Sequence, residues 1–268
     1  MDNTECNVFY ARNLSELFYH IKTIANLKIV GACSTLDKMP KKTISTTNIP
    51  ELKQIIKHER FIEFGPGATL SEILNLGERH LPKILTDSIK TIANPFVRNI
   101  ATIGGNILHE KQKLTLYAPL MAFDSILEFK SPSETRNIPL TMFETIPAGF
   151  VLTKIRVPLR DWDISLFFRL GPENKITDTS ASYTFLVDTE KGIINNIKIA
   201  FAGKITFRAK ELENRLLGLR LPLSSKDIDF YIADAAFQFE KESEGIVYKP
   251  IIKQQYLNLI RYSIEQLT

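Results

Sequence analysis

The 268-residue chain is poor in the residues that most often carry metal or redox chemistry, with two cysteines, four histidines and one tryptophan. Cys6 and Cys33 do not have the spacing of a metal-binding motif. So few cysteines are typical of a protein that works in a reducing compartment. We therefore expect a cytoplasmic protein with no bound metal.

The sequence also lacks long apolar runs and concentrated positive charge. No apolar stretch approaches the roughly 18 residues of a membrane helix. The first residues, MDNTECNVFYARN, do not have the basic segment and apolar core of a secretory signal. The net charge is only +4, and the lysines and arginines are scattered without interleaved aromatics. We therefore expect neither a membrane nor a nucleic acid as a partner.

Familiar catalytic arrangements are missing as well. The spacing of residues suggests no Ser-His-Asp arrangement, and there is no Walker loop. His20, His58, His80 and His109 are isolated from one another in the sequence, and a lone histidine is more often a surface or packed residue than a catalytic one. The composition, 44% hydrophobic and 24% charged, is that of an ordinary globular protein. No catalytic residue is predicted.

The first 160 residues mix helices and strands. Capping residues predict helices that begin at Asn13 and Thr69. Pro50 suits the first position of a helix that continues through Ile56. Strands are expected at 27–30, 60–65, 125–129 and 150–157, a buried helix at 116–123, and a loop at 93–100.

The rest of the chain has a run of strands followed by a run of helices. Strands are expected at 165–169, 180–187 and 193–201, with Lys191-Gly192 as the hairpin turn between the last two. Helices are expected at 209–217, from Ser224 onward, and at 256–267. This change of character places a domain boundary near residue 160 and indicates the α+β class.

The glycine pair Gly104-Gly105 is the feature most suggestive of a ligand. Adjacent residues without Cβ let backbone amides approach a phosphate closely, and successive inward amides form an anion nest. Asn106 is placed to bond the phosphate or to brace the loop. The alternative is a plain glycine turn between two strands.

The surroundings of the glycine pair resemble a known family. The segment Pro95-Phe-Val-Arg-Asn-Ile-Ala-Thr-Ile-Gly-Gly-Asn106 resembles the pattern P-x-x-R-N-x-A-T-I-G-G-N of the flavin-binding subunits of the molybdenum hydroxylases, which include the xanthine dehydrogenase flavin domain and the medium subunit of carbon monoxide dehydrogenase. Further segments that resemble the family are Ile49-Pro-Glu-Leu52, Phe64-Gly-Pro-Gly-Ala-Thr-Leu-Ser-Glu72, Leu120-Met-Ala122, Ile155-Arg-Val-Pro158 and Ile199-Ala-Phe-Ala-Gly203.

The resemblance implies a fold and a cofactor. It implies an α+β protein with a two-lobed flavin-binding fold of the vanillyl-alcohol-oxidase/PCMH type, residues 1–160, with lobes at about 1–55 and 56–160. A small α+β C-terminal domain of the carbon monoxide dehydrogenase flavoprotein type would follow at 161–268. The implied cofactor is FAD, with its pyrophosphate against two loops. The residues carried over as contacts are Val30, Gly31, Ala32, Cys33, Ser34, Thr35, Leu36, Ala101, Thr102, Gly104, Gly105, Asn106, Thr115 and Val151.

Three departures from the family fall on the cofactor side. Ala32 and Cys33 stand where the first loop of the family, A-G-G-T-D-L, has glycines, and a side chain there is poorly tolerated if φ is positive. Thr115 stands where the family has an aspartate that bonds the polar chain of the flavin. Phe150 stands where a glutamate ends the segment over the flavin ring, and that segment is shorter here.

These departures leave two functions open. In the first, the chain binds FAD and passes electrons from iron–sulfur clusters to NAD or another acceptor, beside an iron–sulfur subunit and a molybdopterin-binding subunit. In the second, flavin binding is weak or lost and the chain is a scaffold subunit of such a complex. A free-standing binding module is a third class, against which the implied C-terminal domain argues, because that domain implies docking to larger subunits.

Overall fold

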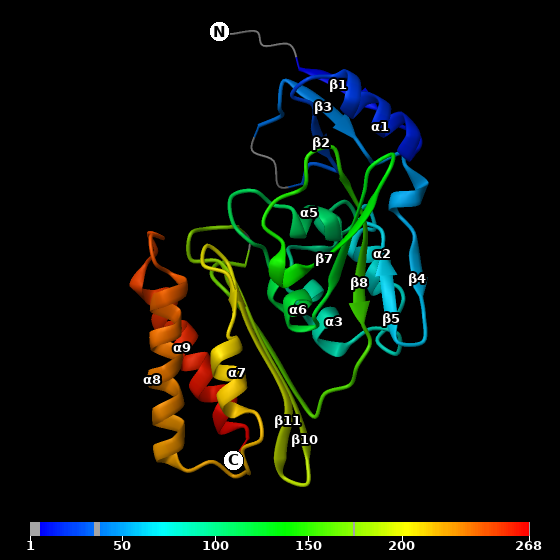
Figure 1. Cartoon of the computed structure of the whole chain (residues 1–268). Coiled ribbons are helices and arrows are strands. Elements are labelled where there is room, and N and C mark those ends of the chain that lie inside the picture. Colours follow the sequence, from blue (N-terminus) through cyan, green and yellow to red (C-terminus); the bar gives the residue numbers. More distant parts are fainter. Residues whose placement is uncertain (1–5, 35–37, 174, 268) are drawn as a thin grey trace. The chain divides into compact units, whose positions relative to one another are not determined.

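The computed structural model describes residues 6–34, 38–173 and 175–267. The chain forms two compact units, each with contributions from several stretches of sequence (Figure 1). The first unit comprises Met1–His80, Ala93–His109 and Asp124–Leu159. The second comprises Leu81–Ile92, Glu110–Phe123 and Arg160–Thr268.

The first unit begins with a small parallel sheet, ordered β1-β3-β2. Its elements are β1 (Asn7–Tyr10), α1 (Leu14–Thr23), β2 (Lys28–Val30) and β3 (Lys42–Ser45). Asn13 caps α1 by accepting a hydrogen bond from the amide of Glu16 at 2.8 Å, as its sequence predicts. Leu17 of α1 packs on Ile44 of β3, so the apolar stripe of the helix closes this lobe.

An antiparallel sheet of five strands makes up the rest of the first unit, in the order β4-β5-β8-β6-β7. Its strands are β4 (Ile55–Lys57), β5 (Phe61–Phe64), β6 (Ile126–Lys130), β7 (Thr135–Pro139) and β8 (Val151–Pro158). Short helices accompany it: η1 (Pro50–Leu52), α2 (Leu70–Leu74), α4 (Pro95–Arg98), α5 (Ile103–Ile107) and η2 (Leu140–Met142). The paired residues Ile62 and Val157 are fully buried, whereas the next pair, Glu63 and Arg156, is polar, so one sheet face belongs to the core.

The helix predicted from Pro50 to Ile56 is wrong beyond its first turn. A 3-10 turn covers Pro50–Leu52, and the chain then extends as β4. Gly65 and Gly67 hold it there, because their amides donate to the carbonyls of Gln54 and Leu52, both at 2.7 Å. Pairing with a strand that follows in the sequence thus overrides the local helical pattern.

The second unit is built on an antiparallel sheet, ordered β12-β11-β10-β9. The strands are β9 (Ile164–Leu170), β10 (Ala181–Glu190), β11 (Ile193–Ala202) and β12 (Phe207–Arg208), and the helices are α3 (Lys83–Lys90), α6 (Tyr117–Ala122), α7 (Lys210–Leu216), α8 (Ser225–Glu242) and α9 (Pro250–Glu265). Helices α7, α8 and α9 cover one face of the sheet (Figure 1). Tyr183 and Phe185 project into this helical core, and α6 packs against β10 and β11.

Most predictions for the second unit are confirmed. The three strands form, and Lys191 and Gly192 make the hairpin turn with φ of +53° and +73°. Ser224 begins α8 with a capping box to Asp227. The last helix starts at Pro250, earlier than residue 256, with the proline at its first position. Strands β1, β3, β7 and β12 were not predicted from the sequence.

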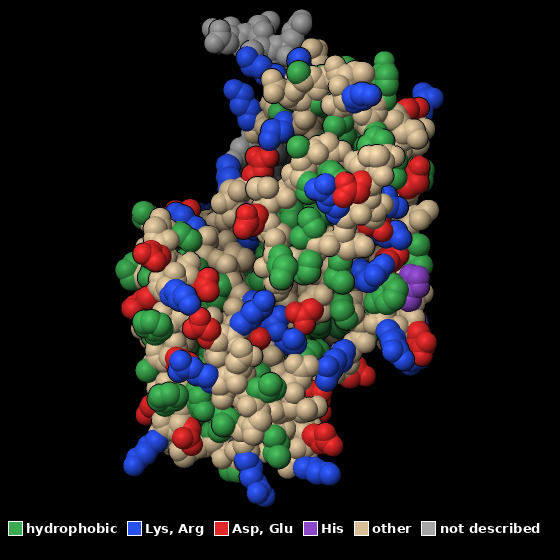
Figure 2. Space-filling view, viewed as in Figure 1, with side chains coloured by type: hydrophobic (Ala, Val, Ile, Leu, Met, Phe, Trp, Pro, Cys, Tyr) green, Lys and Arg blue, Asp and Glu red, His purple; other side chains and the backbone are tan. Residues whose placement is uncertain are grey.

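Charged side chains of both signs are interspersed over the face of the molecule shown in Figure 2, in keeping with the scattered lysines and arginines of the sequence. Within the described ranges, no helix has the length and apolar character needed to cross a bilayer.

Candidate functional site

The glycine pair lies at the start of a short helix, α5, and not in a turn between strands. Thr102 caps this helix, because its hydroxyl oxygen accepts a hydrogen bond from the amide of Gly105 at 3.1 Å. The amide of Ile103 donates to the carbonyl of Ala68 at 3.1 Å, and that of Gly104 to the carbonyl of Pro66 at 2.9 Å. Both glycine amides are therefore satisfied within the protein, which differs from the nest expected from the sequence.

The two glycines differ in how closely other atoms approach them. A Cβ on Gly104 would lie 2.6 Å from both the Cβ and the carbonyl oxygen of Pro66, so only glycine fits against that backbone. Gly105 is exposed, and a Cβ there would meet only the hydroxyl of Thr102, at 3.2 Å. Asn106 is buried with 7% of its surface exposed. Gly104 is thus a packing residue, whereas Gly105 is exposed to solvent.

Pro66 and Ala68, whose carbonyls hold α5, were not predicted as site residues. The signal was present in the segment Phe64-Gly-Pro-Gly-Ala68, which belongs to the family resemblance. Its role becomes visible only in the fold, where Thr69 and Thr102 form an isolated antiparallel bridge.

The first loop, Gly31 to Ser34, follows β2 and offers donors that the second does not. Within the described residues, no amide of Ala32, Cys33 or Ser34 donates a hydrogen bond to the protein. Cys33 has φ of +57°, whereas φ of Ala32 is not positive. Successive amides with such a change of hand form the concave anion sites called nests.

The backbone therefore keeps the left-handed conformation that favours glycine, but the residue in this conformation is a cysteine. Of the two positions suspected from the sequence, Cys33 alone is left-handed. Thr35 and Leu36, also expected to contact the cofactor, lie outside the described residues.

The two loops are neighbours. A Cβ built on Gly31 would lie 3.7 Å from the hydroxyl oxygen of Thr102, so the first loop meets the start of α5. The Thr102 hydroxyl accepts from Gly105 and still has a proton to donate. Burial raises the pKa of the Cys33 thiol, which keeps it uncharged near neutral pH. The amides of Ala32, Cys33 and Ser34, which donate to no described residue, and the hydroxyl of Thr102 make a donor set that fits an anion such as a pyrophosphate, while the Cys33 thiol donates to the carbonyl of Gly31.

The remaining predicted contacts lie elsewhere. Val30 ends β2 and is buried, and Ala101 is buried just before Thr102. Val151 begins β8 and packs in the core of the small lobe with Leu17 and Ile44, so its side chain is not available to a ligand. Thr115 belongs to the second compact unit, in the turn before α6.

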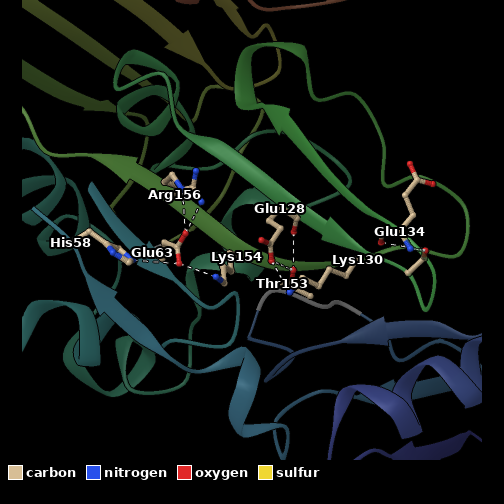
Figure 3. A network of polar contacts seen from close by, with 9 residues as sticks. His58, Glu63, Glu128, Lys130, Glu134, Thr153, Lys154 and Arg156 are labelled. Atoms are coloured by element: carbon tan, nitrogen blue, oxygen red, sulfur yellow. Dashed lines mark hydrogen bonds and ion pairs between the residues drawn. The ribbon is translucent and has the colours of Figure 1, made fainter. Parts of the chain in front are cut away.

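A second polar cluster, not predicted from the sequence, lies on the polar face of the five-stranded sheet (Figure 3). Glu63 has 7% of its side chain exposed and accepts hydrogen bonds from Lys154 at 2.9 Å and from Arg156 at 2.8 and 3.1 Å. His58 lies 3.6 Å from the same carboxylate and stacks on Phe61. A buried carboxylate of β5 thus joins β8 and His58, the residue that follows β4.

An irregular register between β6 and β8 extends this cluster. Lys154 pairs with Glu128, but the next pair is Leu152 with Phe129, so Thr153 is an extra residue on β8. The bulge lets the hydroxyl of Thr153 donate to the Glu128 carboxylate at 2.7 Å (Figure 3). Leu152 returns to the buried face.

The Glu63 cluster predicts an acid-sensitive contribution to stability. Burial alone would raise the pKa of Glu63, but the hydrogen bonds and charges of Lys154 and Arg156 hold it below the ordinary value of 4.5. The contribution is therefore complete above pH 4.5 and is lost as the pH falls through the lower pKa of the folded state. Unfolding measured by denaturant across the acid range should show a smaller dependence on pH in Glu63→Gln than in the unmodified chain. Equal dependence in both proteins would contradict this prediction.

Among the described residues, no three or more His, Cys, Asp or Glu side chains gather in a way that could hold a metal ion. Cys6 and Cys33 are both free thiols.

Comparison with known proteins places these loops in a family. Residues 3–160 match the family model described as FAD binding domain in molybdopterin dehydrogenase. The chain is 28% identical over 141 residues to the xanthine dehydrogenase FAD-binding subunit of Escherichia coli O157:H7, covering 52% of this chain and 46% of that protein. It is 24% identical over 176 residues to the nicotine 6-hydroxylase medium subunit of Paenarthrobacter nicotinovorans, covering 62% and 60%. The alignments thus span about half the length of these curated relatives.

A solved structure with the same fold is that of reconstituted CO dehydrogenase from Oligotropha carboxidovorans, with a TM-score of 0.80 and 17% identity over 98% of this chain and 97% of that chain. The predicted two-lobed flavin-binding fold is thereby confirmed. Since the family model covers more than half of the sequence, the chain belongs to the family of FAD binding domains in molybdopterin dehydrogenase, the flavin-binding subunits of the molybdenum hydroxylases, whose cofactor is FAD.

Proposed function

We propose that this chain binds FAD and serves as the electron-transfer subunit of a multi-subunit molybdenum hydroxylase. Bound FAD would supply the redox chemistry, in which electrons arrive from iron–sulfur clusters and leave to NAD or another acceptor. The partners would be an iron–sulfur subunit and a molybdopterin-binding subunit. The names of the Escherichia coli and Paenarthrobacter relatives, both of which are subunits, support this assembly.

The observation that carries the proposal is the set of amides at Ala32, Cys33 and Ser34, which donate to none of the described residues, beside the hydroxyl of Thr102. In the proposal these groups hold the pyrophosphate of FAD, and the exposed side of Gly105 leaves room for it. Amides fixed by the backbone stabilise a phosphate charge without a bound cation. The glycine pair then acts indirectly, because its own amides fix α5 and thereby the position of Thr102.

Three further assignments belong to the same proposal. The remaining residues carried over from the family, including Val30, Asn106 and Thr115, are cofactor residues in it, and Val151 takes part through its backbone, since its side chain lies in the core. The domain division at about residue 160 is retained for the family's two domains. The location is the cytoplasm, where the reduced cysteines and the partner subunits are expected.

The proposal predicts opposite outcomes for two neighbouring substitutions. Cys33→Gly removes a side chain from a left-handed residue, so we expect FAD to bind more tightly and stability to rise by up to about 1 kcal/mol. Ala32→Gly, at a position without positive φ, should instead lower stability by about 0.5–1 kcal/mol. Titration with FAD followed by the visible flavin spectrum measures the first effect, and denaturant unfolding measures the second.

The FAD proposal would be wrong if neither the unmodified chain nor Cys33→Gly showed a flavin band at saturating FAD while both proteins were folded. The chain would then be the flavin-deficient scaffold subunit. In that case, the Gly105→Asp variant, which places a negative charge at the exposed glycine, should co-purify with a molybdopterin-binding subunit as well as the unmodified chain does.

A further inference from the structure

Three backbone segments of the first unit lie against one another at glycines. The middle one is Gly65-Pro-Gly-Ala68, called segment 65–68 below. A Cβ on Gly65 would lie 2.3 Å from the carbonyl oxygen of Leu52, and one on Gly67 would lie 2.9 Å from the same atom. On the other side, a Cβ on Gly104 would lie 2.6 Å from the carbonyl oxygen of Pro66. Segment 65–68 is thus in direct backbone contact with both η1 and α5.

Hydrogen bonds hold the same three segments together. The amide of Gly67 donates to the carbonyl of Leu52 at 2.7 Å. The amides at the start of α5 donate to carbonyls of segment 65–68, as described above. None of the three glycines has a positive φ, so the close approach of other backbone, and not an unusual conformation, is the reason for glycine at these positions.

The contacts continue through the small lobe and return to the first loop. The Leu52 side chain is buried in the same apolar cluster as Ile44 of β3. Strand β3 pairs with β2, and the first loop follows β2. That loop meets Thr102 at Gly31, and Thr102 caps the helix that segment 65–68 holds. The two loops are therefore joined twice, directly at Thr102 and by way of Leu52 and segment 65–68.

We propose that Gly67 is a positioning residue, which sets the spacing between the first loop and Thr102 and thereby the affinity of the site for a pyrophosphate. The inference rests on the proposed function, because the pyrophosphate concerned is that of FAD. Hydrogen bonds to a charged oxygen are short, and they weaken steeply when the geometry changes. A Cβ on residue 67 does not fit 2.9 Å from the carbonyl oxygen of Leu52, so segment 65–68 would move away from η1 and take α5 with it.

Gly67→Ala tests the inference in the full chain. Its affinities for FAD and for ADP, measured by calorimetric titration, should both fall by on the order of tenfold and by the same factor, because the two ligands share the pyrophosphate. Amide hydrogen exchange at Ile103 and Gly104 should become faster, since both amides donate to the displaced segment. Should Gly67→Ala fail to fold, Pro66→Ala frees φ without adding bulk and should weaken the binding of both ligands.

Leu140→Ala is the matched control. Leu140 is buried in the first unit and follows β7, at the opposite edge of the five-stranded sheet from β4. The cavity should lower stability but leave the affinities of the folded protein for FAD and ADP unchanged. Equal losses of affinity in Leu140→Ala and Gly67→Ala would overturn the inference, because reduced stability would then be the cause. Unchanged affinities in Gly67→Ala, or a loss for FAD alone, would also overturn it.

The proposed function and this inference fail in different ways. A chain that binds ADP but not FAD would contradict the flavin function, and the ADP affinity of Gly67→Ala would then decide the inference. If Gly67→Ala bound FAD as tightly as the unmodified chain does, the inference alone would be wrong. A chain that binds neither ligand would contradict both.

Discussion

Arg208→Ala is expected to lower the free energy of unfolding by about 3–5 kcal/mol, because it leaves the buried carboxylate of Glu213 without its ion-pair partner. The side chains of Arg208 and Glu213 are only 5% and 8% exposed. Two nitrogens of Arg208 donate to the two oxygens of Glu213, Nη2 to Oε2 at 2.9 Å. Glu213 also accepts from the amide of Ile199 at 2.6 Å. One carboxylate thus ties α7 to β11 and β12 within the second unit.

The exposed ion pair between Lys241 and Glu211 provides the control, since their side chains are 57% and 50% exposed. Lys241→Ala should change the free energy of unfolding far less than Arg208→Ala does, because water screens an exposed ion pair. Replacing both buried partners, in Arg208→Met with Glu213→Leu, should cost less than Arg208→Ala because no charge remains buried. Denaturant unfolding measures all three. An Arg208→Ala variant as stable as Lys241→Ala would contradict the prediction.

The features that the sequence predicted well are those determined by nearby residues. The capping boxes at Thr69 and Ser224 each need partners three residues away, and both form. The hairpin at Lys191-Gly192 needs only residues that accept positive φ. The family resemblance supplied the two-lobed fold, which no periodicity in the chain would have revealed.

The features that were missed depend on residues far apart in the sequence. The helix predicted beyond Leu52 gives way to a strand because Gly65 and Gly67 bond its backbone. The Glu63 cluster needs Lys154 and Arg156, which only the register of β5 and β8 brings together. The donors suited to an anion were expected at both loops. Within the described residues, the amides without a hydrogen bond to the protein are at the first loop, since Pro66 and Ala68 accept from those at the start of α5.

The different roles of Gly104 and Gly105 give the second prediction with a large expected effect. Gly104→Ala would set a Cβ 2.6 Å from the backbone oxygen of Pro66, and neither partner has a flexible end that can move away. We expect it to destabilise the first unit by about 1–3 kcal/mol, the usual range for overpacking. FAD binding should be weakened with it, because Pro66 and α5 fix the position of Thr102. Thermal unfolding and titration with FAD measure the two effects.

Gly105 is the matched control, one residue along the same helix. Gly105→Ala adds a Cβ that meets only the Thr102 hydroxyl, at 3.2 Å, so it should change stability by less than about 1 kcal/mol. Gly105→Asp should leave the fold intact and weaken FAD binding, since its charge would repel a pyrophosphate at the first loop. The substitutions would thus separate packing from ligand binding within one dipeptide. If Gly104→Ala were as stable as Gly105→Ala, the close contact with Pro66 would not be the reason for glycine at position 104. The proposal that the glycine pair acts by fixing α5 and Thr102 would then be wrong.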